Sequence, residues 1–187
     1  VNMDDIWEGM EDDPDAQERI KKSVELLDVK EGMIVLDVGC HKQEVKKLIP
    51  EKSYYYGIDS LQLNPSTITL NIDGGFDFQF KADRITCLEV LEHLKNPKSA
   101  LLSIELILKH DGIAVISLPN EATLFHRIRC LFGIVDRECF SVNGKHLHLP
   151  SLKQSREFLK EHFTILKEEY YTTQEGRGIR PEWVQSI

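Results

Sequence analysis

The sequence predicts one α/β domain of the doubly wound, Rossmann-like class, with a mostly parallel sheet and helices on its faces. Strand-length apolar runs alternate along the chain with amphipathic helical stretches, and five of these runs end in acidic, glycine or asparagine residues. The chain has 187 residues, of which 41% are hydrophobic, and this is enough for a single core. Alternating strands and helices form βαβ units with right-handed crossovers, which is why we expect this sheet.

The predicted domain occupies residues 14–172. A helix is expected to begin at Pro14, because proline is tolerated in a first turn, and Ile20, Val24 and Leu27 would form its apolar stripe. Met33 to Val38 is a continuous apolar run, which suits a central strand buried on both faces. Further strands are expected over residues 54–58, 67–72, 83–88, 113–118 and 163–171.

Helices are expected between these strands. A short one would turn Val45, Leu48 and Ile49 inward. Asn96-Pro97 opens a strongly periodic helix that Asp111-Gly112 is expected to end. Two more helices are predicted over residues 124–132 and 152–163. Outside the domain, residues 1–13 predict an acidic, flexible arm and residues 173–187 a C-terminal tail.

Composition and charge exclude several classes of protein. The formal net charge is −8, and no dense block of Lys and Arg occurs, so no nucleic-acid partner is expected. The apolar runs are far shorter than the roughly 20 residues needed to span a bilayer, so no membrane insertion is expected. The acidic N-terminal stretch predicts no signal peptide. The four cysteines are isolated, which favours reduced thiols and a cytoplasmic protein.

The polar residues that follow the predicted strands indicate where a ligand binds. In open α/β sheets, ligands bind beyond the carboxyl ends of the strands. Gly39 lets the backbone after the first strand approach a ligand closely, because glycine has no Cβ. Asp59 follows the next strand twenty residues later, which is roughly the offset at which a carboxylate binds both ribose hydroxyls of a nucleoside. A single Asp after a strand is nonetheless more often a cap or turn residue.

Several segments in order resemble class I S-adenosylmethionine-dependent methyltransferases, in the subgroup with an "EVLEHL" segment, of methyltransferase type 11/23. The resemblance covers about residues 15–172. It lies in Leu36-Asp37-Val38-Gly39-Cys40, Tyr56-Gly57-Ile58-Asp59, Leu88-Glu89-Val90-Leu91-Glu92-His93-Leu94, Leu108-Lys109-His110-Asp111-Gly112, Ser117-Leu118-Pro119-Asn120 and His146-Leu147-His148.

The resemblance implies S-adenosylmethionine as the cofactor and assigns roles to matching positions. Asp37 would organise the first turn, and the backbone of Gly39, Cys40 and His41 would face the methionine moiety. Asp59 would bind the ribose, Asp73 would border the adenine, and Glu89 would lie near the reaction centre. His93 is the candidate general base, because imidazole titrates near neutrality, although it is also explained as a helix-start residue. His146 and His148 would line the acceptor side or simply alternate along a strand.

The chain departs from the family pattern in three places. The usual Asp-x-Gly-x-Gly-x-Gly turn has His41 and Gln43 where glycines are expected, which predicts a positive φ at non-glycine residues and weaker cofactor binding. Only residues 60–66 separate the second and third strands, too few for the usual helix, so the fold is expected to be shortened there. Few strand-forming residues follow Tyr171, which indicates that the last strand could be missing.

Three functions remain open from the sequence. The first is an S-adenosylmethionine-dependent methyltransferase acting on a small-molecule, lipid-linked or glycan-linked acceptor. The second is a catalytically degenerate relative that serves as an interaction or regulatory module. The third is a dinucleotide-dependent oxidoreductase, although no G-x-G-x-x-G occurs.

No metal is expected, and the alternative is a divalent cation bound by Glu89, Glu92 and His93. The acceptor, which residues 120–150 would recognise, and the oligomeric state are not predicted.

Overall fold

The computed structural model describes residues 14–119, 131, 147–148, 150–172 and 179–186. The strands are β1 Ile34–Val38, β2 Tyr54–Asp59, β3 Ile68–Thr69, β4 Ala82–Leu88, β5 Leu108–Ser117, β6 Thr164–Thr172 and β7 Ile179–Ser186. The α-helices are α2 Pro14–Leu27, α3 Pro97–Ile107 and α5 Leu152–Lys160, and the 3-10 helices are η2 Val45–Lys47, η3 Ile72–Gly74 and η4 Leu91–His93.

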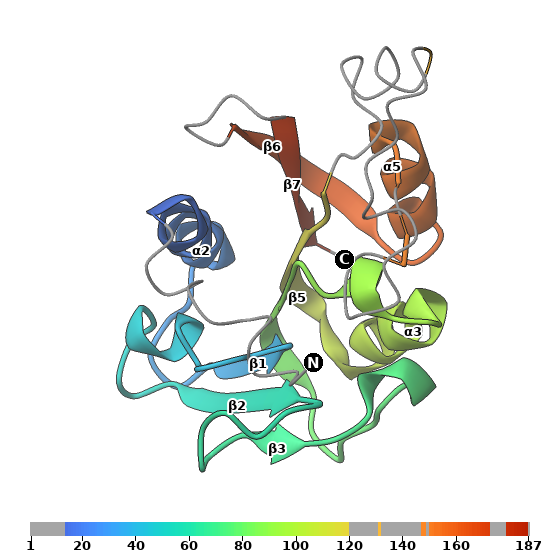
Figure 1. Ribbon diagram of the computed structural model, residues 1–187. Helices are drawn as coiled ribbons and strands as arrows, with labels where there is room; N and C mark the ends of the chain where they lie inside the picture. The colour runs from blue at the N-terminus through green and yellow to red at the C-terminus, as the bar shows by residue number, and fades with distance from the viewer. Residues whose placement is uncertain (1–13, 120–130, 132–146, 149, 173–178, 187) are drawn as a thin grey trace.

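The strands form one seven-stranded sheet in the order β3-β2-β1-β4-β5-β7-β6. β7 runs antiparallel to both of its neighbours, and the pairs from β3 to β5 are parallel. Helix α2 lies on one face of the sheet, and α3 and α5 lie on the other (Figure 1). The predicted doubly wound, mostly parallel Rossmann-like fold is therefore confirmed.

Helix α2 begins at Pro14 as predicted, but its buried stripe differs from the expected one. Ala16, Arg19, Ser23 and Leu27 are buried, whereas Ile20 is only half-buried. Ile20 faces a hollow beside the end of β1 instead of the core, which explains its exposure. The helix is tied to β4 at its C-terminus, where Arg84 Nε donates a hydrogen bond to the Leu27 carbonyl at 2.5 Å.

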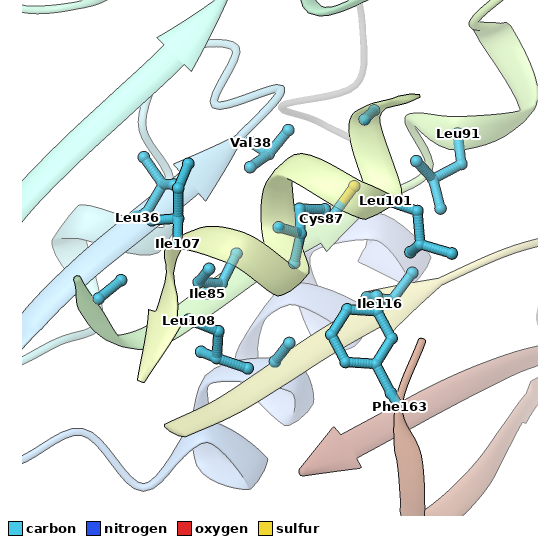
Figure 2. Close-up of a cluster of buried hydrophobic side chains, with 14 of the residues drawn as sticks. Leu36, Val38, Ile85, Cys87, Leu91, Leu101, Ile107, Leu108, Ile116 and Phe163 are labelled. Carbon is cyan, nitrogen blue, oxygen red and sulfur yellow. The ribbon is translucent and has the colours of Figure 1, made fainter. Parts of the chain in front are cut away.

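The main core lies between the sheet and the helices α3 and α5. It joins strand residues such as Ile85 and Cys87 to Leu101 and Ile107 of α3 and to Phe163, just after α5 (Figure 2). A smaller cluster around Leu27 and Val115 packs α2 on the opposite face. The continuous apolar runs of the sequence are thus explained by strands that are covered on both faces.

Helix α3 starts at its predicted cap but ends earlier than expected. Asn96 accepts a hydrogen bond from the Ser99 N–H and Pro97 occupies the first turn. The helix ends at Ile107, not at Asp111-Gly112, because the backbone from Leu108 onward already pairs with β4. Ala82 pairs with Leu108 and Arg84 with Ile113, so residues 109–112 form a bulge between the two pairs.

The sheet is shortened between β2 and β3, as predicted. Residues 60–67 connect the two strands without a helix, and β3 has two residues in place of the predicted six. The strand stops because Asn71 caps η3 through a hydrogen bond from the Asp73 N–H. An aromatic row follows η3 and packs along the sheet, with Tyr56 stacked on Phe80 at 4.5 Å and Phe80 on Phe78 at 5.0 Å between ring centroids.

The expectation that the last strand could be missing is wrong. β7 lies between β5 and β6 and pairs with both of them. Its sequence hides this role because Pro181 is unusual in a paired strand. Pro181 pairs only with Tyr170 of β6, one residue before the stretch from Glu182 to Ser186 that also pairs with β5. The strand therefore exists because two neighbours supply hydrogen-bond partners, not because of its own pattern.

Some predictions lie outside the described residues. They include the helix expected over residues 124–132, apart from residue 131, and His146 of the acceptor side. The helix predicted over residues 152–163 is α5, which begins with a capping box between Ser151 and Gln154. No helix among the described residues is both long and apolar enough to cross a membrane.

Candidate functional site

Asp37 lies at the end of β1 and joins three neighbouring strands. Its Oδ2 accepts a hydrogen bond from the Tyr55 hydroxyl of β2 at 2.6 Å, and its Oδ1 accepts one from Thr86 Oγ1 of β4 at 2.7 Å. Burial raises the pKa of Asp37 to about 6, the two hydrogen bonds oppose this shift, and the nearby charge of Asp59 adds to it. Asp37 thus orders the end of β1 from inside the protein, where it is 4% exposed.

The raised pKa of Asp37 predicts an unusual pH dependence of stability. Its pKa of about 6 in the folded protein lies above the unfolded value, so the folded state binds the proton more readily. The free energy of unfolding should therefore rise as the pH falls from about 7 to 4, by at most about 3 kcal/mol from this group. Asp37→Asn should lack this contribution, and urea denaturation at several pH values measures the difference.

Asp83→Asn is the matched control for this experiment. Although burial opposes the shift, hydrogen bonds from Lys109 and from the Ile34 N–H hold the pKa of Asp83 below its usual value. Asp83 therefore stabilises the protein above its unfolded pKa and loses that contribution in acid. The difference in unfolding free energy between each variant and the wild type should change with pH in opposite directions for the two variants. A change in the same direction would contradict the assignment to Asp37.

The turn after β1 is fixed against the end of β2. The Gly39 and Cys40 N–H groups both donate to the Ile58 carbonyl, at 2.8 and 3.0 Å. Gly39 has a φ of +73°, and a Cβ at this position would lie 2.3 Å from Val90 Cγ2. Glycine is therefore required here for its conformation and for the packing of the segment after β4, and not only for access by a ligand.

His41 and Asp59 meet directly. The His41 N–H donates to Asp59 Oδ2 at 2.9 Å, while Asp59 Oδ1 accepts from the Leu61 N–H at 3.1 Å and from Ser60 Oγ at 3.4 Å. A carboxylate has about four acceptor positions, so Asp59 retains capacity for a further donor. The predicted positive φ at position 41 is confirmed, with a value of 44°.

Gln43, the second residue in place of a glycine, also has a positive φ, of 64°. Its buried side chain donates to Thr67 Oγ1 at 3.2 Å and accepts from Ser66 Oγ at 2.9 Å. Cys40 Sγ lies 3.6 Å from the same Thr67 hydroxyl. The two departures are therefore linked, because Gln43 binds the end of the short connection that replaces the usual helix between β2 and β3.

Asp73 follows β3 in η3 and connects to α3. Its Oδ1 accepts hydrogen bonds from the Lys95 N–H at 2.5 Å and from the Asn96 N–H at 3.3 Å. These contacts join η3 to the start of α3 and leave the carboxylate half-buried. Nothing in the local sequence indicates this pairing, since the partners lie more than twenty residues away.

Glu89 is held by Ser117, which carries no sequence signal for this role. Ser117 Oγ, at the end of β5, accepts from the Glu89 N–H and donates to Glu89 Oε1, both at 2.9 Å. Glu89 has a φ of 53°, a conformation that is strained for a residue other than glycine. Ser117 begins one of the segments that resemble the methyltransferases, but only the parallel pairing of Leu88 with Ser117 brings it to Glu89.

The alternative metal site is not formed. Glu89 turns toward Ser117, whereas Glu92 is buried beside His93, with Oε1 3.9 Å from His93 Nε2. Among the described residues, no three His, Cys, Asp or Glu side chains lie close enough together to hold a metal ion. The three side chains do not come together because Glu89 precedes η4, whereas Glu92 and His93 lie within it.

A hollow of about 70 Å³ lies between α2 and the turn after β1, lined by Gln17, Arg19, Ile20, Asp37, Gly39 and His41, among others. Sites for small organic molecules typically have volumes of about 300–1,000 Å³, so this hollow is much too small for a nucleoside cofactor. The acceptor capacity of Asp59 and the backbone approach at Gly39 fit an adenosyl ligand. The His41 side chain, which lines the hollow, must move to admit the whole of it.

Comparison with known proteins gives a consistent picture. A sequence-family model described as a methyltransferase domain matches residues 13–165. A ubiquinone biosynthesis O-methyltransferase from Glaesserella parasuis serovar 5 (strain SH0165) is 52% identical over 40 residues. That match covers 21% of this chain and 17% of the curated relative, so it spans only a small part of either protein.

Solved structures share the fold at low sequence identity. The N-methyltransferase NodS from Bradyrhizobium japonicum WM9, in complex with S-adenosyl-L-homocysteine, superposes with a TM-score of 0.70 at 16% identity, covering 95% of this chain and 89% of that one. The 1,6-didemethyltoxoflavin-N1-methyltransferase from Burkholderia thailandensis gives a TM-score of 0.73 at 13% identity, covering 98% of this chain and 83% of that one. These similarities concern the fold.

Proposed function

The chain belongs to the methyltransferase-domain family, and we propose that it transfers the methyl group of S-adenosylmethionine to a small-molecule acceptor. The observation that carries this proposal is the contact between the His41 N–H and Asp59 Oδ2 at 2.9 Å. It joins the turn after β1 to the carboxylate after β2, the two elements that would bind an adenosyl group. The two structural neighbours named above are both methyltransferases, which supports the same activity.

The proposed roles of the side chains come from the resemblance to methyltransferases, and the contacts of these side chains support them. Asp59 would accept hydrogen bonds from the ribose hydroxyls, and Asp37 would keep the turn of Gly39, Cys40 and His41 in place. Asp73 would border the adenine, and Glu89, fixed by Ser117, would lie at the methionine end. S-adenosylmethionine supplies an electrophilic methyl group. A lone pair of the acceptor would form the new bond to this carbon as the bond between carbon and sulfur breaks, and the electrons of the broken bond would stay on the sulfur.

His93 is the proposed general base. Its imidazole is 20% exposed and lies 3.9 Å from the buried Glu92 carboxylate, whose negative charge would stabilise the imidazolium formed when His93 accepts a proton. An acceptor that has already lost its proton needs no base, and alignment of the reacting atoms then supplies most of the catalysis. We propose a cytoplasmic location for this reaction, and the free thiols of Cys40 and Cys87 support it.

Isothermal titration with S-adenosylmethionine and S-adenosylhomocysteine tests the proposed function directly. Binding at micromolar to submillimolar concentration is expected, because Asp59 and the turn provide the polar contacts. An absence of heat at millimolar ligand would overturn the proposal.

Replacing His41 by glycine should tighten cofactor binding about 5- to 30-fold. Residue His41 lines the 70 Å³ hollow, so admitting the cofactor requires its imidazole to move, at a cost of roughly 1–2 kcal/mol. Glycine removes this cost and opens the hollow. The dissociation constants of both proteins, measured by titration, give the change.

Gln43→Gly is the matched control, since it also replaces a positive-φ residue by glycine. Gln43 does not line the hollow, and its side chain bonds to Thr67 and Ser66. This variant should lose stability without binding the cofactor more tightly. Equal affinities for His41→Gly and the wild type would show that the imidazole is no obstacle.

A further inference from the structure

A second cavity, of about 430 Å³, lies on the opposite face of the sheet from the hollow at the first turn. Its size is within the range of about 300–1,000 Å³ typical of sites for small organic molecules. η4, the end of β5, the segment before α5 and α5 itself surround it. Its apolar walls are formed by Leu91, Pro97, Leu118, Leu147, Pro150 and Phe158.

Two buried polar side chains line this mostly apolar cavity. Glu92 is 1% exposed, and its carboxylate has the 3.9 Å contact with His93 described above. Ser155, on α5, is 2% exposed, and its hydroxyl finds no hydrogen-bond partner among the residues that the structure describes. A buried hydroxyl that forms no hydrogen bond costs about 1–3 kcal/mol, and a ligand in the cavity could supply the missing bond.

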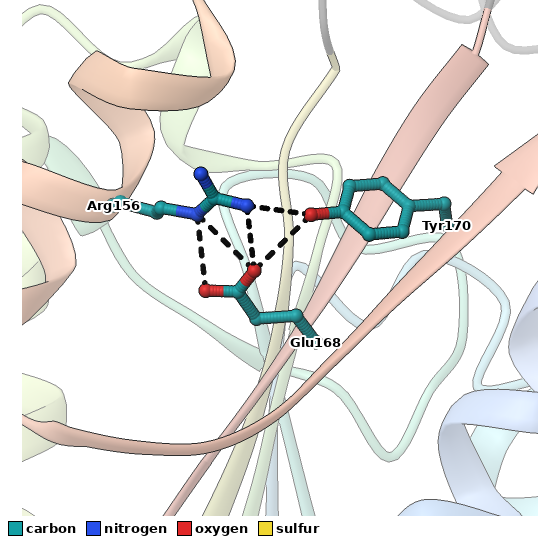
Figure 3. Close-up of polar contacts among 3 residues, drawn as sticks. All are labelled: Arg156, Glu168 and Tyr170. Carbon is teal, nitrogen blue, oxygen red and sulfur yellow. Dashed lines mark hydrogen bonds and ion pairs between the residues drawn. The ribbon is translucent and has the colours of Figure 1, made fainter.

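The walls of the cavity are held from outside. Arg156, next to Ser155, forms a bidentate ion pair with Glu168 of β6 (Figure 3). Its Nε donates to Oε1 at 3.1 Å and its Nη2 donates to Oε2 at 2.8 Å, and Nη2 also donates to the Tyr170 hydroxyl. Opposite α5, the Leu147 and His148 N–H groups donate to the Glu92 carbonyl at 2.7 and 3.1 Å. These contacts fix both sides, so the cavity is formed before any ligand binds.

On the basis of the proposed function, we propose that this cavity binds the methyl acceptor, a largely apolar molecule whose amine or hydroxyl group donates a hydrogen bond to Glu92. A cationic amine beside a buried carboxylate favours the ionised form of that carboxylate, and the ionised form accepts a hydrogen bond from a charged donor more strongly than from a neutral one. An anionic ligand would lose its hydration in this apolar surrounding without such a gain from the Glu92 carboxylate. Ser155 Oγ would receive or donate a second hydrogen bond at the opposite wall.

The position of the cavity agrees with this role. Glu92 and Leu118 follow the carboxyl ends of β4 and β5, and Asp37 and Asp59 end β1 and β2. β2, β1, β4 and β5 are consecutive neighbours in the sheet, so all four residues lie along one edge. Glu89, three residues before Glu92, lies between the two sites in the chain. An acceptor in the cavity would thus approach the cofactor from the face of α3 and α5.

Three probes that differ only in their head group test the inference: 4-phenylbutylamine, 4-phenylbutan-1-ol and 4-phenylbutanoate. Binding to the full chain without cofactor is measured at pH 7 by isothermal titration or ligand-observed NMR. The amine should bind most tightly, and the carboxylate at least about tenfold more weakly than the amine. In Glu92→Gln, which keeps the size of the side chain, this preference should fall to within about twofold.

Glu105→Gln is the matched control, because Glu105 is a carboxylate of α3 that does not line the cavity and bonds to His162. It should keep the preference for the amine. Ser155→Leu fills the cavity with apolar atoms, and it should abolish binding of all three probes without lowering the melting temperature. This second variant decides the question if Glu92→Gln does not fold.

The inference is overturned if the carboxylate binds the wild type as tightly as the amine does, if no probe binds, or if Glu92→Gln keeps the preference. Cofactor titration separates the two proposals. Cofactor binding without probe discrimination rejects the acceptor site alone. Probe discrimination without cofactor binding rejects the proposed function and leaves Glu92 as a binding site for amines and alcohols.

Discussion

Gly39→Ala should lose about 2–5 kcal/mol of unfolding free energy, a large part of the roughly 5–15 kcal/mol typical of a domain. The new Cβ would lie 2.3 Å from Val90 Cγ2, which forces the segment after β4 away from the turn. The φ of +73° adds a cost of about 1 kcal/mol for any residue with a Cβ. Cofactor binding should be lost as well, because the turn would shift. Urea denaturation and titration measure both effects.

Two comparisons separate the contributions to this loss. Gly32 has a similar φ of +81°, but a Cβ there would meet no atom within 4 Å, so Gly32→Ala reports the conformational cost alone. Gly39→Ala in a Val90→Ala background removes the overlapping methyl group and should recover most of the excess loss. If Gly39→Ala were no less stable than Gly32→Ala, the packing of Val90 against the turn would not be the reason for the glycine.

Asp59→Ala should weaken cofactor binding about 100- to 1,000-fold. In the proposed complex, the ribose hydroxyls take the remaining acceptor position of Asp59 and displace the long 3.4 Å bond from Ser60 Oγ, so that the net loss on substitution is about 3–4 kcal/mol. The substitution also removes the acceptor of the His41 N–H, which is 2.9 Å away, and so loosens the turn. Titration with S-adenosylhomocysteine measures the loss.

The ligand itself provides the control for Asp59. The 2′,3′-dideoxy analogue of S-adenosylhomocysteine lacks both hydroxyls, so it should bind the wild type much more weakly than the parent compound. Asp59→Ala should bind the two ligands almost equally, because the partner of the hydroxyls is gone. If Asp59→Ala preferred the parent compound over the dideoxy analogue as strongly as the wild type does, another residue would bind the ribose.

The sequence predicted the framework of the site because that framework depends on local patterns. Gly39 and Asp59 each follow a run of apolar residues, and parallel pairing of Asp37 with Gly57 and of Val38 with Ile58 places the two strand ends side by side. The positive φ of His41 could be predicted in the same way, since the position is one where the family pattern has glycine. The capped start of α3 at Asn96-Pro97 is equally local.

Contacts between distant segments could not be predicted. The partners of Asp37, which are Tyr55 and Thr86, come from two other strands and carry no signal of this role. Ser117 reaches Glu89 only through the register of β4 with β5. The alternative metal site shows the same limit, since the spacing of Glu89, Glu92 and His93 does not determine where their side chains point, and among the described residues these three form no cluster that could hold an ion.

The sequence by itself thus determined the order of strands and helices over residues 14–117, the turn after β1 and the carboxylate after β2, because periodicity and turn chemistry act over a few residues. Only the tertiary structure decided that β7 completes the sheet despite Pro181, that Gln43 binds the short connection at Thr67, and that Glu92 and Ser155 line one cavity. Those features depend on hydrogen-bond partners and packing surfaces contributed by residues far apart in the chain, whose positions are fixed only when the sheet is assembled.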